Sequence, residues 1–226
     1  MALQAIDEKL GEAREVIAEA LHSSAPACVT CSFQTEDMLV VELVREHIPG
    51  IPVLFLETGY HFPKVYRYRD EMTERYGLNL VNVTPEQTLA DHESAFGLLH
   101  QSRPDECCKL RKVGPLFAAL EPYSVWFTGL RRVQSPTRVN LQPIDQFPLP
   151  SGKQLVKVSP LAAWSDREVW ESARERGIPV LSLYNDGYTS IGCAPCTAKP
   201  TDANNLRSGR WAGRKLECGI HIAGAH

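Results

Sequence analysis

The residues with the clearest capacity for chemistry are cysteines. The chain has seven, among them a vicinal pair at Cys107 and Cys108 and a C-x-x-C pair at Cys193 and Cys196. Two close pairs of thiols suit a metal centre, because thiolates bind both zinc and iron–sulfur clusters. The spacing therefore predicts a metal site on these four residues, and it does not choose between zinc and a [4Fe-4S] cluster.

Cys28 and Cys31 also have the spacing of a redox or metal motif, but they fall in an apolar, strand-like stretch at residues 27–31. Side chains three residues apart in a strand point to opposite faces, so these two thiols cannot meet at one metal. Cysteine is often buried as a small apolar side chain. We interpret both as core residues and leave them out of the site.

The seventh thiol, Cys218, lies near the C-terminal end and follows Arg214 and Lys215. Cationic neighbours lower the pKa of a thiol and raise the fraction of thiolate that can attack an electrophile. A single cysteine near a terminus is more often incidental, but here the other six thiols have assignments. The sequence thus predicts Cys218 as a nucleophile.

Basic residues gather near the cysteines and in the stretches that we expect to be loops. They are Arg111, Lys112, Arg131, Arg132, Arg138, Arg207 and Arg210. Each alone is as readily a solvated surface charge. Because arginine binds oxyanions bidentately, their common placement predicts that several converge on one anionic group.

Composition limits the classes of function. The chain has 226 residues, 43% of them hydrophobic, which is enough for one full core. Its net charge of −3 gives no overall basic field for a nucleic acid and favours a small anionic ligand. The N-terminal residues lack the apolar run of a signal peptide, and no apolar stretch is long enough to span a membrane, so we expect a cytoplasmic protein that binds no membrane.

The hydrophobic pattern alternates between strands and helices, which predicts an α/β fold around a mostly parallel sheet. Strands are expected at 27–31, 53–56, 78–83, 123–128 and 155–158. Helices are expected at 5–21, 38–44 and 109–120. A charged helix is expected to end near residue 76. Two more are expected to begin at capping residues, one at Thr84 running toward His100 and one at Ser165 running to about residue 176. Residues 130–140 carry no helical pattern, residues 141–152 are expected to be a surface loop, and residues 178–226 form an irregular tail.

The loop that begins at Ser32 joins the first strand to its helix. Such a loop lies at the carboxyl end of a parallel sheet, where backbone N–H groups and the helix dipole favour an anion. Ser32, Phe33 and Gln34 are thus candidate phosphate-binding or sulfate-binding residues. The alternative is an ordinary turn, because the loop has no glycine of the kind that a P-loop uses.

Four motifs resemble those of bacterial assimilatory adenylyl-sulfate (APS) reductases, iron–sulfur members of the PAPS/APS reductase family, and they occur in the family's order. They are ECCKLRKVGPL at 106–116, TGLRRVQSPTR at 128–138, GCAPCT at 192–197 and ECGIH at 217–221. The resemblance spans nearly the whole chain. It implies an adenine nucleotide alpha-hydrolase-like fold, with an α/β nucleotide-binding domain at 1–206 and a mobile C-terminal segment at 207–226.

The resemblance also implies a cofactor, a nucleophile and a reaction. Cys107, Cys108, Cys193 and Cys196 would hold a [4Fe-4S] cluster, and Cys218 would take sulfite from APS as S-sulfocysteine and pass it on with thioredoxin as reductant. The implied substrate-binding residues are Lys112, Arg138, Arg207, Arg210, Ser32, Phe33 and Gln34 around the phosphosulfate, and the backbone of Leu56 and Gly129 around the adenosine.

Alternatives remain at this stage. Relatives that use the 3′-phosphorylated substrate (PAPS) lack the four cluster cysteines, which favours APS, although some cluster-bearing members accept both substrates. A nucleotide sensor stabilised by a metal cluster would need no reactive Cys218. A Gly-rich loop typical of ATP-cleaving relatives is absent, which disfavours ATP pyrophosphatase chemistry. The sequence leaves the oligomeric state open, a homo-oligomer included.

Overall fold

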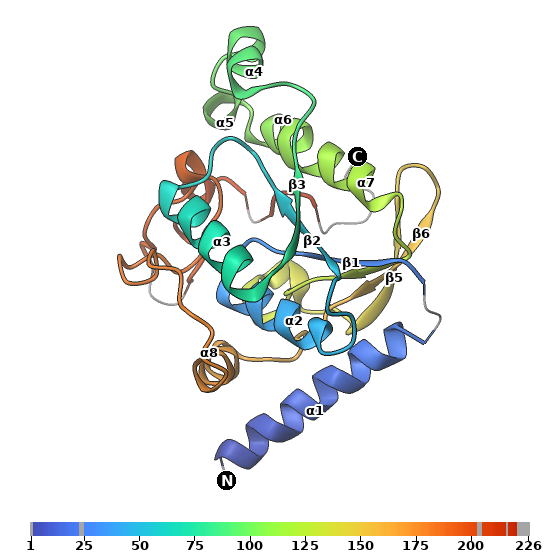
Figure 1. The fold of residues 1–226 in the computed structure, drawn as a ribbon. Helices are drawn as coiled ribbons and strands as arrows, with labels where there is room; N and C mark the ends of the chain where they lie inside the picture. Colours follow the sequence, from blue (N-terminus) through green and yellow to red (C-terminus); the bar gives the residue numbers. More distant parts are fainter. Residues whose placement is uncertain (1, 23–24, 203–204, 216, 221–226) are drawn as a thin grey trace.

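The computed structural model describes residues 2–22, 25–202, 205–215 and 217–220, with side chains from Ile6 onward. A six-stranded sheet forms the centre of the molecule (Figure 1), in the order β3-β2-β1-β4-β6-β5. Its strands are β1 (Ala27–Thr30), β2 (Pro52–Leu56), β3 (Asn79–Val83), β4 (Val125–Phe127), β5 (Ile144–Pro148) and β6 (Gln154–Val158). All neighbouring strands are parallel except β5 and β6, so the predicted mostly parallel α/β fold is confirmed.

Helices lie on both faces of the sheet and beyond its carboxyl edge (Figure 1). They are α1 (Ala2–Ala20), α2 (Thr35–Arg45), α3 (Pro63–Tyr76), α4 (Leu89–Phe96), α5 (Leu99–Ser102), α6 (Pro104–Cys108), α7 (Gly114–Leu120) and α8 (Asp166–Glu175). Lys109–Val113 forms a π-helical turn, η1, between α6 and α7. The capping box at Ser165 is confirmed, because its side chain and that of Glu168 bond each other's backbone N–H groups.

Two of the expected boundaries are wrong. The stretch 141–152 contains β5, whose residues pair with β6 from Ile144↔Val158 to Pro148↔Gln154 and form a hairpin at the edge of the sheet. Proline and glycine suggested a loop here, but an edge strand tolerates proline because one side of it needs no partner. The helix expected from Thr84 begins instead after Thr88, whose side chain accepts a hydrogen bond from the N–H of Asp91.

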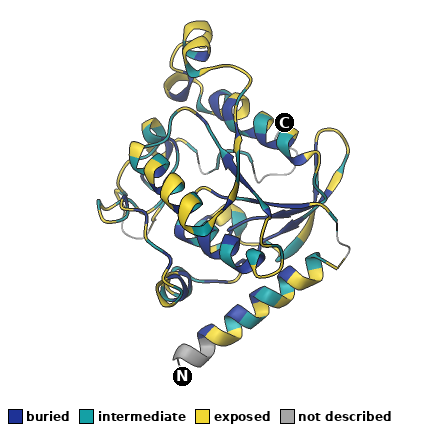
Figure 2. Ribbon diagram, in the orientation of Figure 1, coloured by how far each residue is buried: buried dark blue, intermediate teal, exposed yellow. Residues whose placement is uncertain are grey.

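Apolar side chains form a core on each face of the sheet, and Figure 2 shows the central strands buried between the helices. The larger core packs the inner faces of α1, α2, α3 and α8 against one face, and the smaller packs α7 against the other. Cys31 belongs to the first core and Cys28 to the second. Both are buried free thiols, which confirms the prediction that they point to opposite faces of β1.

The strand order reverses direction between β1 and β4, the two central strands. At such a switch point, the loops that leave the two strands diverge and open a crevice at the carboxyl edge of the sheet. The Ser32 loop leaves β1 here, and the segment from Thr128 to Arg138 leaves β4. In the described residues, no helix combines the length and the apolar character that a membrane crossing requires.

Candidate functional site

A cavity of 1060 Å³ opens at this switch point. Its lining comes from the segments that follow β1, β2 and β4, from η1, and from the C-terminal segment, including Cys218. This volume is in the range of nucleotide and cofactor sites. Every predicted substrate-binding residue except Phe33 lines the cavity.

One wall of the cavity is the Ser32 loop, defined here as residues 32–37. The N–H and the hydroxyl of Ser32 both donate to the Oδ2 atom of Asp37, at 2.7 and 2.6 Å. Burial raises the pKa values of Glu36 and Asp37, which lie in the first turn of α2. Two donors of this loop that could bind an anion, the N–H and the hydroxyl of Ser32, are therefore already used by a carboxylate of the same chain.

Gly129 closes against the same loop at the end of β4. A Cβ atom on this residue would overlap the side chain of Asp37 and lie 3.0 Å from its backbone nitrogen. Only a glycine lets the two chain segments approach this closely. Gln34 extends the wall, because its Nε2 donates to Ser32 Oγ and its Oε1 accepts from the N–H of Ile191, each at 2.9 Å. The bond from Ile191 connects the Ser32 loop to the segment that precedes Cys193.

Phe33 does not have the place predicted for it. Its side chain is fully buried and packs edge-on against Phe55 and Tyr68, so it belongs to the core and not to the cavity lining. Its φ angle of 60° turns the backbone sharply between Ser32 and α2. Any contact of Phe33 with a ligand would have to come from its backbone.

His61 was not predicted as a site residue, yet it lines the cavity beside Leu56. Its Nε2 lies 2.7 Å from the carbonyl oxygen of Leu56 and donates to it. Burial lowers the pKa of His61 to about 4, and the charge of Lys112 acts in the same direction. The imidazole is therefore neutral at physiological pH. Its place in the loop after the second strand was the signal that sequence analysis could have used.

The four predicted metal ligands line one small second cavity together with Lys112. Cys107 and Cys108 come from α6, and Cys193 and Cys196 from a turn on the other side of the cavity. The hydroxyl of Thr58 lies 3.3 Å from the sulfur of Cys193. In the part of the chain that the structure describes, no group of three or more metal-binding side chains is already arranged around an ion position. Four thiols at one cavity nonetheless fit a tetrathiolate metal centre in the chemistry of their donors.

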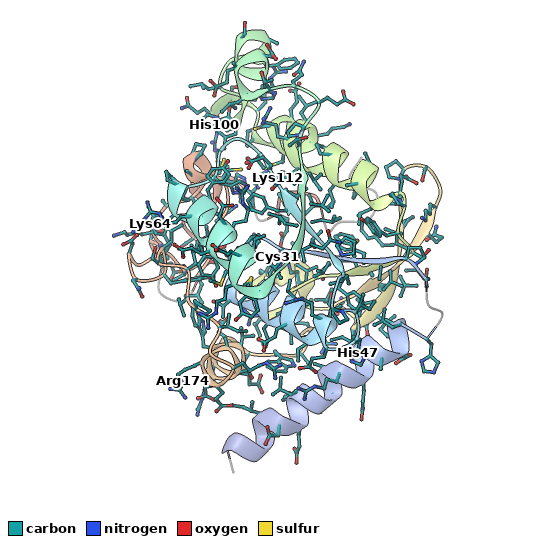
Figure 3. The ribbon with its side chains drawn as sticks, in the orientation of Figure 1. Cys31, His47, Lys64, His100, Lys112 and Arg174 are labelled. Carbon is teal, nitrogen blue, oxygen red and sulfur yellow. The ribbon has the colours of Figure 1, made fainter. Side chains whose placement is uncertain are left out.

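The electrostatics of this thiol cavity depend on Lys112, which η1 turns toward the sulfurs. Figure 3 shows Lys112 between His100 and the sheet. Burial raises the pKa of Cys107 to about 12. Burial also acts to raise the pKa of Cys193, but Lys112, Thr58 and other neighbours outweigh it and leave that pKa below its usual value. In turn, the thiolate charges outweigh the burial of Lys112 and raise its pKa, so the ammonium group stays charged.

Arg210 lies between the two cavities. It is 5% exposed and donates to Thr197 Oγ1 at 3.0 Å, and its buried Nε–H has no hydrogen-bond partner among the residues that the structure describes. An unpaired buried donor is costly, and an oxyanion in the cavity would satisfy it. Gly192 packs directly on the guanidinium, because a Cβ atom there would overlap it.

Arg138 and Arg207 complete a cationic wall, defined here as Lys112, Arg138, Arg207 and Arg210. Both arginines contact Glu217, the residue before Cys218, with its Oε2 atom 2.8 Å from Arg138 Nη2 and 3.6 Å from Arg207 Nη2. Cys218 itself is half-buried and lines the main cavity. Leu216 and His221 of the terminal motif lie outside the described residues.

Three other arginines singled out by the sequence have structural roles in the described structure. Arg111 is buried and donates to the carbonyl oxygens of Thr58 and Gln87. Arg131 pairs with Asp166, and Arg132 donates to the carbonyl oxygen of Leu141. The two cationic residues before Cys218 also point elsewhere, because Arg214 and Lys215 bond the α5–α6 region. Glu217 was the functional residue most clearly missed, since its motif was noted without a role for the carboxylate.

Comparison with known proteins agrees with this geometry. Residues 26–199 match the sequence profile of the phosphoadenosine phosphosulfate reductase domain. A protein of Mycobacterium tuberculosis named adenosine 5'-phosphosulfate reductase is 46% identical over 200 residues, which cover 86% of this chain and 78% of the relative. A protein of the same name from Mycolicibacterium smegmatis is 47% identical over 190 residues, with 83% and 79% covered.

Solved structures show the same fold. A phosphoadenylyl-sulfate reductase from Candida auris, crystallised as a phosphate complex, matches 88% of this chain and 98% of its own with a TM-score of 0.72 and 22% identity. An NH3-dependent NAD synthetase from Campylobacter jejuni matches 82% of this chain and 79% of its own with a TM-score of 0.54 and 10% identity. The predicted adenine nucleotide alpha-hydrolase-like fold is thereby confirmed.

Proposed function

This chain belongs to the phosphoadenosine phosphosulfate reductase domain family, and from that premise we propose that it reduces adenylyl sulfate to sulfite and AMP with thioredoxin as the electron donor. The observation that carries the proposal is the position of Cys218, which lines the same cavity as four basic side chains. A nucleophile beside an oxyanion-binding wall suits a substrate whose reacting sulfur is part of an anion. The relatives named adenosine 5'-phosphosulfate reductase support the choice of substrate.

The reaction balances in two steps on the chain's own thiol. The thiolate of Cys218 attacks the sulfur of adenylyl sulfate, an S–S bond forms, and the bond from that sulfur to the phosphate oxygen breaks with its electron pair leaving on AMP. A thiolate of thioredoxin then attacks Sγ of Cys218 and expels sulfite, and its second thiol resolves the mixed disulfide. The dithiol supplies both electrons, and Cys218 is restored.

The two walls would divide the work of binding. The cationic wall would neutralise the phosphosulfate, with the Ser32 loop beside it, Gln34 included. The backbone of Leu56 and Gly129, at the ends of two neighbouring strands, would hold the adenosine. His61 would contribute by fixing the carbonyl of Leu56, to which it already donates.

A [4Fe-4S] cluster on Cys107, Cys108, Cys193 and Cys196 is part of the proposal. When bound, it would supply a fixed charge and a rigid support next to Lys112, while the thiols of Cys218 and thioredoxin carry the electrons. Lys112 contacts this region from one side and lines the substrate cavity on the other. The cytoplasmic location and the mobility of the segment 207–226 stay predictions.

The decisive experiment incubates purified protein with labelled adenylyl sulfate and no reductant, then weighs the C-terminal peptide. We expect one SO3 adduct on Cys218, released as sulfite when thioredoxin is added. PAPS in a parallel reaction should give a slower adduct, and equal rates would assign a dual reductase. Iron and sulfide analysis of the same sample tests the cluster. Iron-replete protein that never carries the adduct would refute the proposed reaction.

A further inference from the structure

Glu217, the residue that precedes Cys218, is held by several polar contacts in the described C-terminal segment. Its Oε1 accepts from Arg138 Nε at 2.9 Å and from the hydroxyl of Thr137 at 3.1 Å. Its Oε2 accepts from Arg138 Nη2 at 2.8 Å. The side chain is only 7% exposed. A bidentate, charge-assisted pair of this kind fixes both distance and orientation.

We infer that Glu217 is a positioning residue of the reaction. Its carboxylate pairs with arginines that line the cavity, and this pairing keeps the neighbouring Cys218 at the cavity. The inference rests on the proposed function. The two residues are adjacent in the chain, so fixing the carboxylate of one restricts where the thiol of the next can lie. Cys218 itself has no comparable anchor among the contacts of its own side chain in the described structure.

Two further contacts hold the same segment, and they differ in kind. Lys215 donates to Asp105 Oδ1 at 2.8 Å and to the sulfur of Cys108 at 3.3 Å, which anchors the chain before Glu217 on α6. Ile220 packs against the smaller core after Cys218. The Glu217 anchor lies between these two. It is made to Arg138 and Arg207 of the cationic wall, which couples the thiol to that wall.

The Glu217 contacts leave room for a substrate. Arg138 has five N–H donors, of which Nε and one on Nη2 serve Glu217 and one on Nη1 serves Gln134. The cationic wall carries four positive charges, so one carboxylate still leaves a net positive surface for a phosphosulfate. Glu217 and the substrate can therefore be held by the wall at the same time.

A positioning role predicts that rate and affinity separate. Glu217→Gln removes the charge and keeps the side chain's shape. We expect the rate of adduct formation on Cys218 to fall about tenfold, the size of one lost charge-assisted contact, while the Kd for AMP changes less than about twofold. Glu217→Asp keeps the charge and should recover part of the rate. Glu15→Gln, on the exposed face of α1, is the matched control and should change neither quantity.

A double mutant of Glu217 and Arg138 provides the second test. In the background of Arg138→Gln, the additional change Glu217→Gln should slow adduct formation far less than it does alone, because the pair is already broken. Trypsin supplies a readout that needs no reaction, since Glu217→Gln should expose the segment around Lys215 and speed its cleavage several-fold.

The outcomes separate the two proposals. An adduct rate in Glu217→Gln equal to that of the parent, or a loss that appears wholly in the Kd for AMP, would overturn the positioning role and leave the proposed function standing. If the parent protein forms no adduct at all, the proposed function fails, and the trypsin arm still decides whether Glu217 holds the segment. If trypsin then cleaved the parent and the variant equally fast, the inference that Glu217 holds the segment would be overturned as well.

Discussion

The two walls of the main cavity satisfy their polar groups in opposite ways. In the Ser32 loop, a carboxylate of the same chain accepts from the backbone and the hydroxyl of Ser32, at a helix start where an anion was expected. In the cationic wall, the Nε–H of Arg210 has no partner in the described part of the chain, although the side chain is buried. At the first wall a carboxylate of the same chain occupies the donors of Ser32, whereas at the second a buried charged donor has no such partner among the described residues.

This difference separates a fold-building element from a ligand-binding one. The Ser32 loop and Gly129 meet beside the two central strands at the switch point, where close packing requires a glycine at 129 against the half-buried Asp37. The cationic wall has charges that burial disfavours, and burial lowers the pKa of Arg207 to about 10. Cationic side chains persist at such positions when an anion compensates them. The free energy of ligand binding should therefore depend mainly on the cationic wall.

The largest effect should come from the thiol that the cationic wall faces. Cys218→Ser should lower adduct formation and sulfite release by more than about a thousandfold, because a hydroxyl is a far weaker nucleophile. AMP binding should stay within about twofold, since the wall itself is unchanged. Cys28→Ala, in the smaller core, is the control and should keep the adduct. If Cys218→Ser released sulfite at the rate of the parent protein, Cys218 would not be the nucleophile.

Arg210 tests the binding half of the comparison. Arg210→Gln should weaken AMP binding about a hundredfold, or roughly 2.7 kcal/mol, because a buried charge that pairs with the ligand is lost. Adenosine, which carries no phosphate, should bind the variant and the parent alike. Arg132→Gln removes a cation that also lines the cavity but already bonds a backbone carbonyl in the described contacts, so it should cost much less. Titration calorimetry with both ligands measures the contrast, and equal losses for AMP and adenosine would contradict it.

Sequence analysis predicted the mostly parallel sheet, the loop that begins at Ser32 and the grouping of the two cysteine pairs, because each depends on local pattern or on residue chemistry. It missed β5, since pairing at a sheet edge depends on β6 and not on the composition of 141–152. It also placed Phe33 in the site, where only the tertiary structure reveals a core side chain. The partner of Glu217 could not be predicted, because Arg138 lies far away in the sequence and the two meet only in the fold.

His61 lines the main cavity beside Leu56 and should make stability depend on pH. Its folded pKa of about 4 is below the unfolded value of about 6.5, so falling pH protonates the unfolded chain first. Stability from this residue is present above about pH 6.5 and is lost as pH falls toward 4. At pH 5 the loss is about 2 kcal/mol relative to pH 8. Urea unfolding should show this loss of unfolding free energy in the parent protein and not in His61→Gln. If the unfolding free energies of the two proteins changed identically with pH, a neutral imidazole with a lowered pKa at His61 would be excluded.

A substitution at Gly192 tests whether ligand binding by the cationic wall depends on the close packing of Gly192 against Arg210. Gly192→Ala would place a methyl group against the guanidinium of Arg210 and displace it. We expect AMP binding to weaken about tenfold, or roughly 1.4 kcal/mol, with little change for adenosine. Gly50→Ala, where an added Cβ meets nothing within 4 Å, is the matched control. If Gly192→Ala bound AMP like the parent, Arg210 would have room to bind from another position.

Ser32→Ala should have the smallest effect and sharpens the comparison most. If the Ser32 loop is a completed structural element, losing one hydroxyl that bonds Asp37 should change the Kd for AMP by no more than about threefold, roughly 0.6 kcal/mol. The cost should appear instead in the free energy of unfolding, at about 1 kcal/mol, because Asp37 loses the hydroxyl donor and keeps only backbone donors such as the N–H groups of residues 32 and 129. Ser151→Ala, in the exposed β5–β6 turn, is the control. A loss of AMP affinity as large as that of Arg210→Gln would make the Ser32 loop a ligand-binding wall after all, since the hydroxyl would then have to turn from Asp37 to the phosphate.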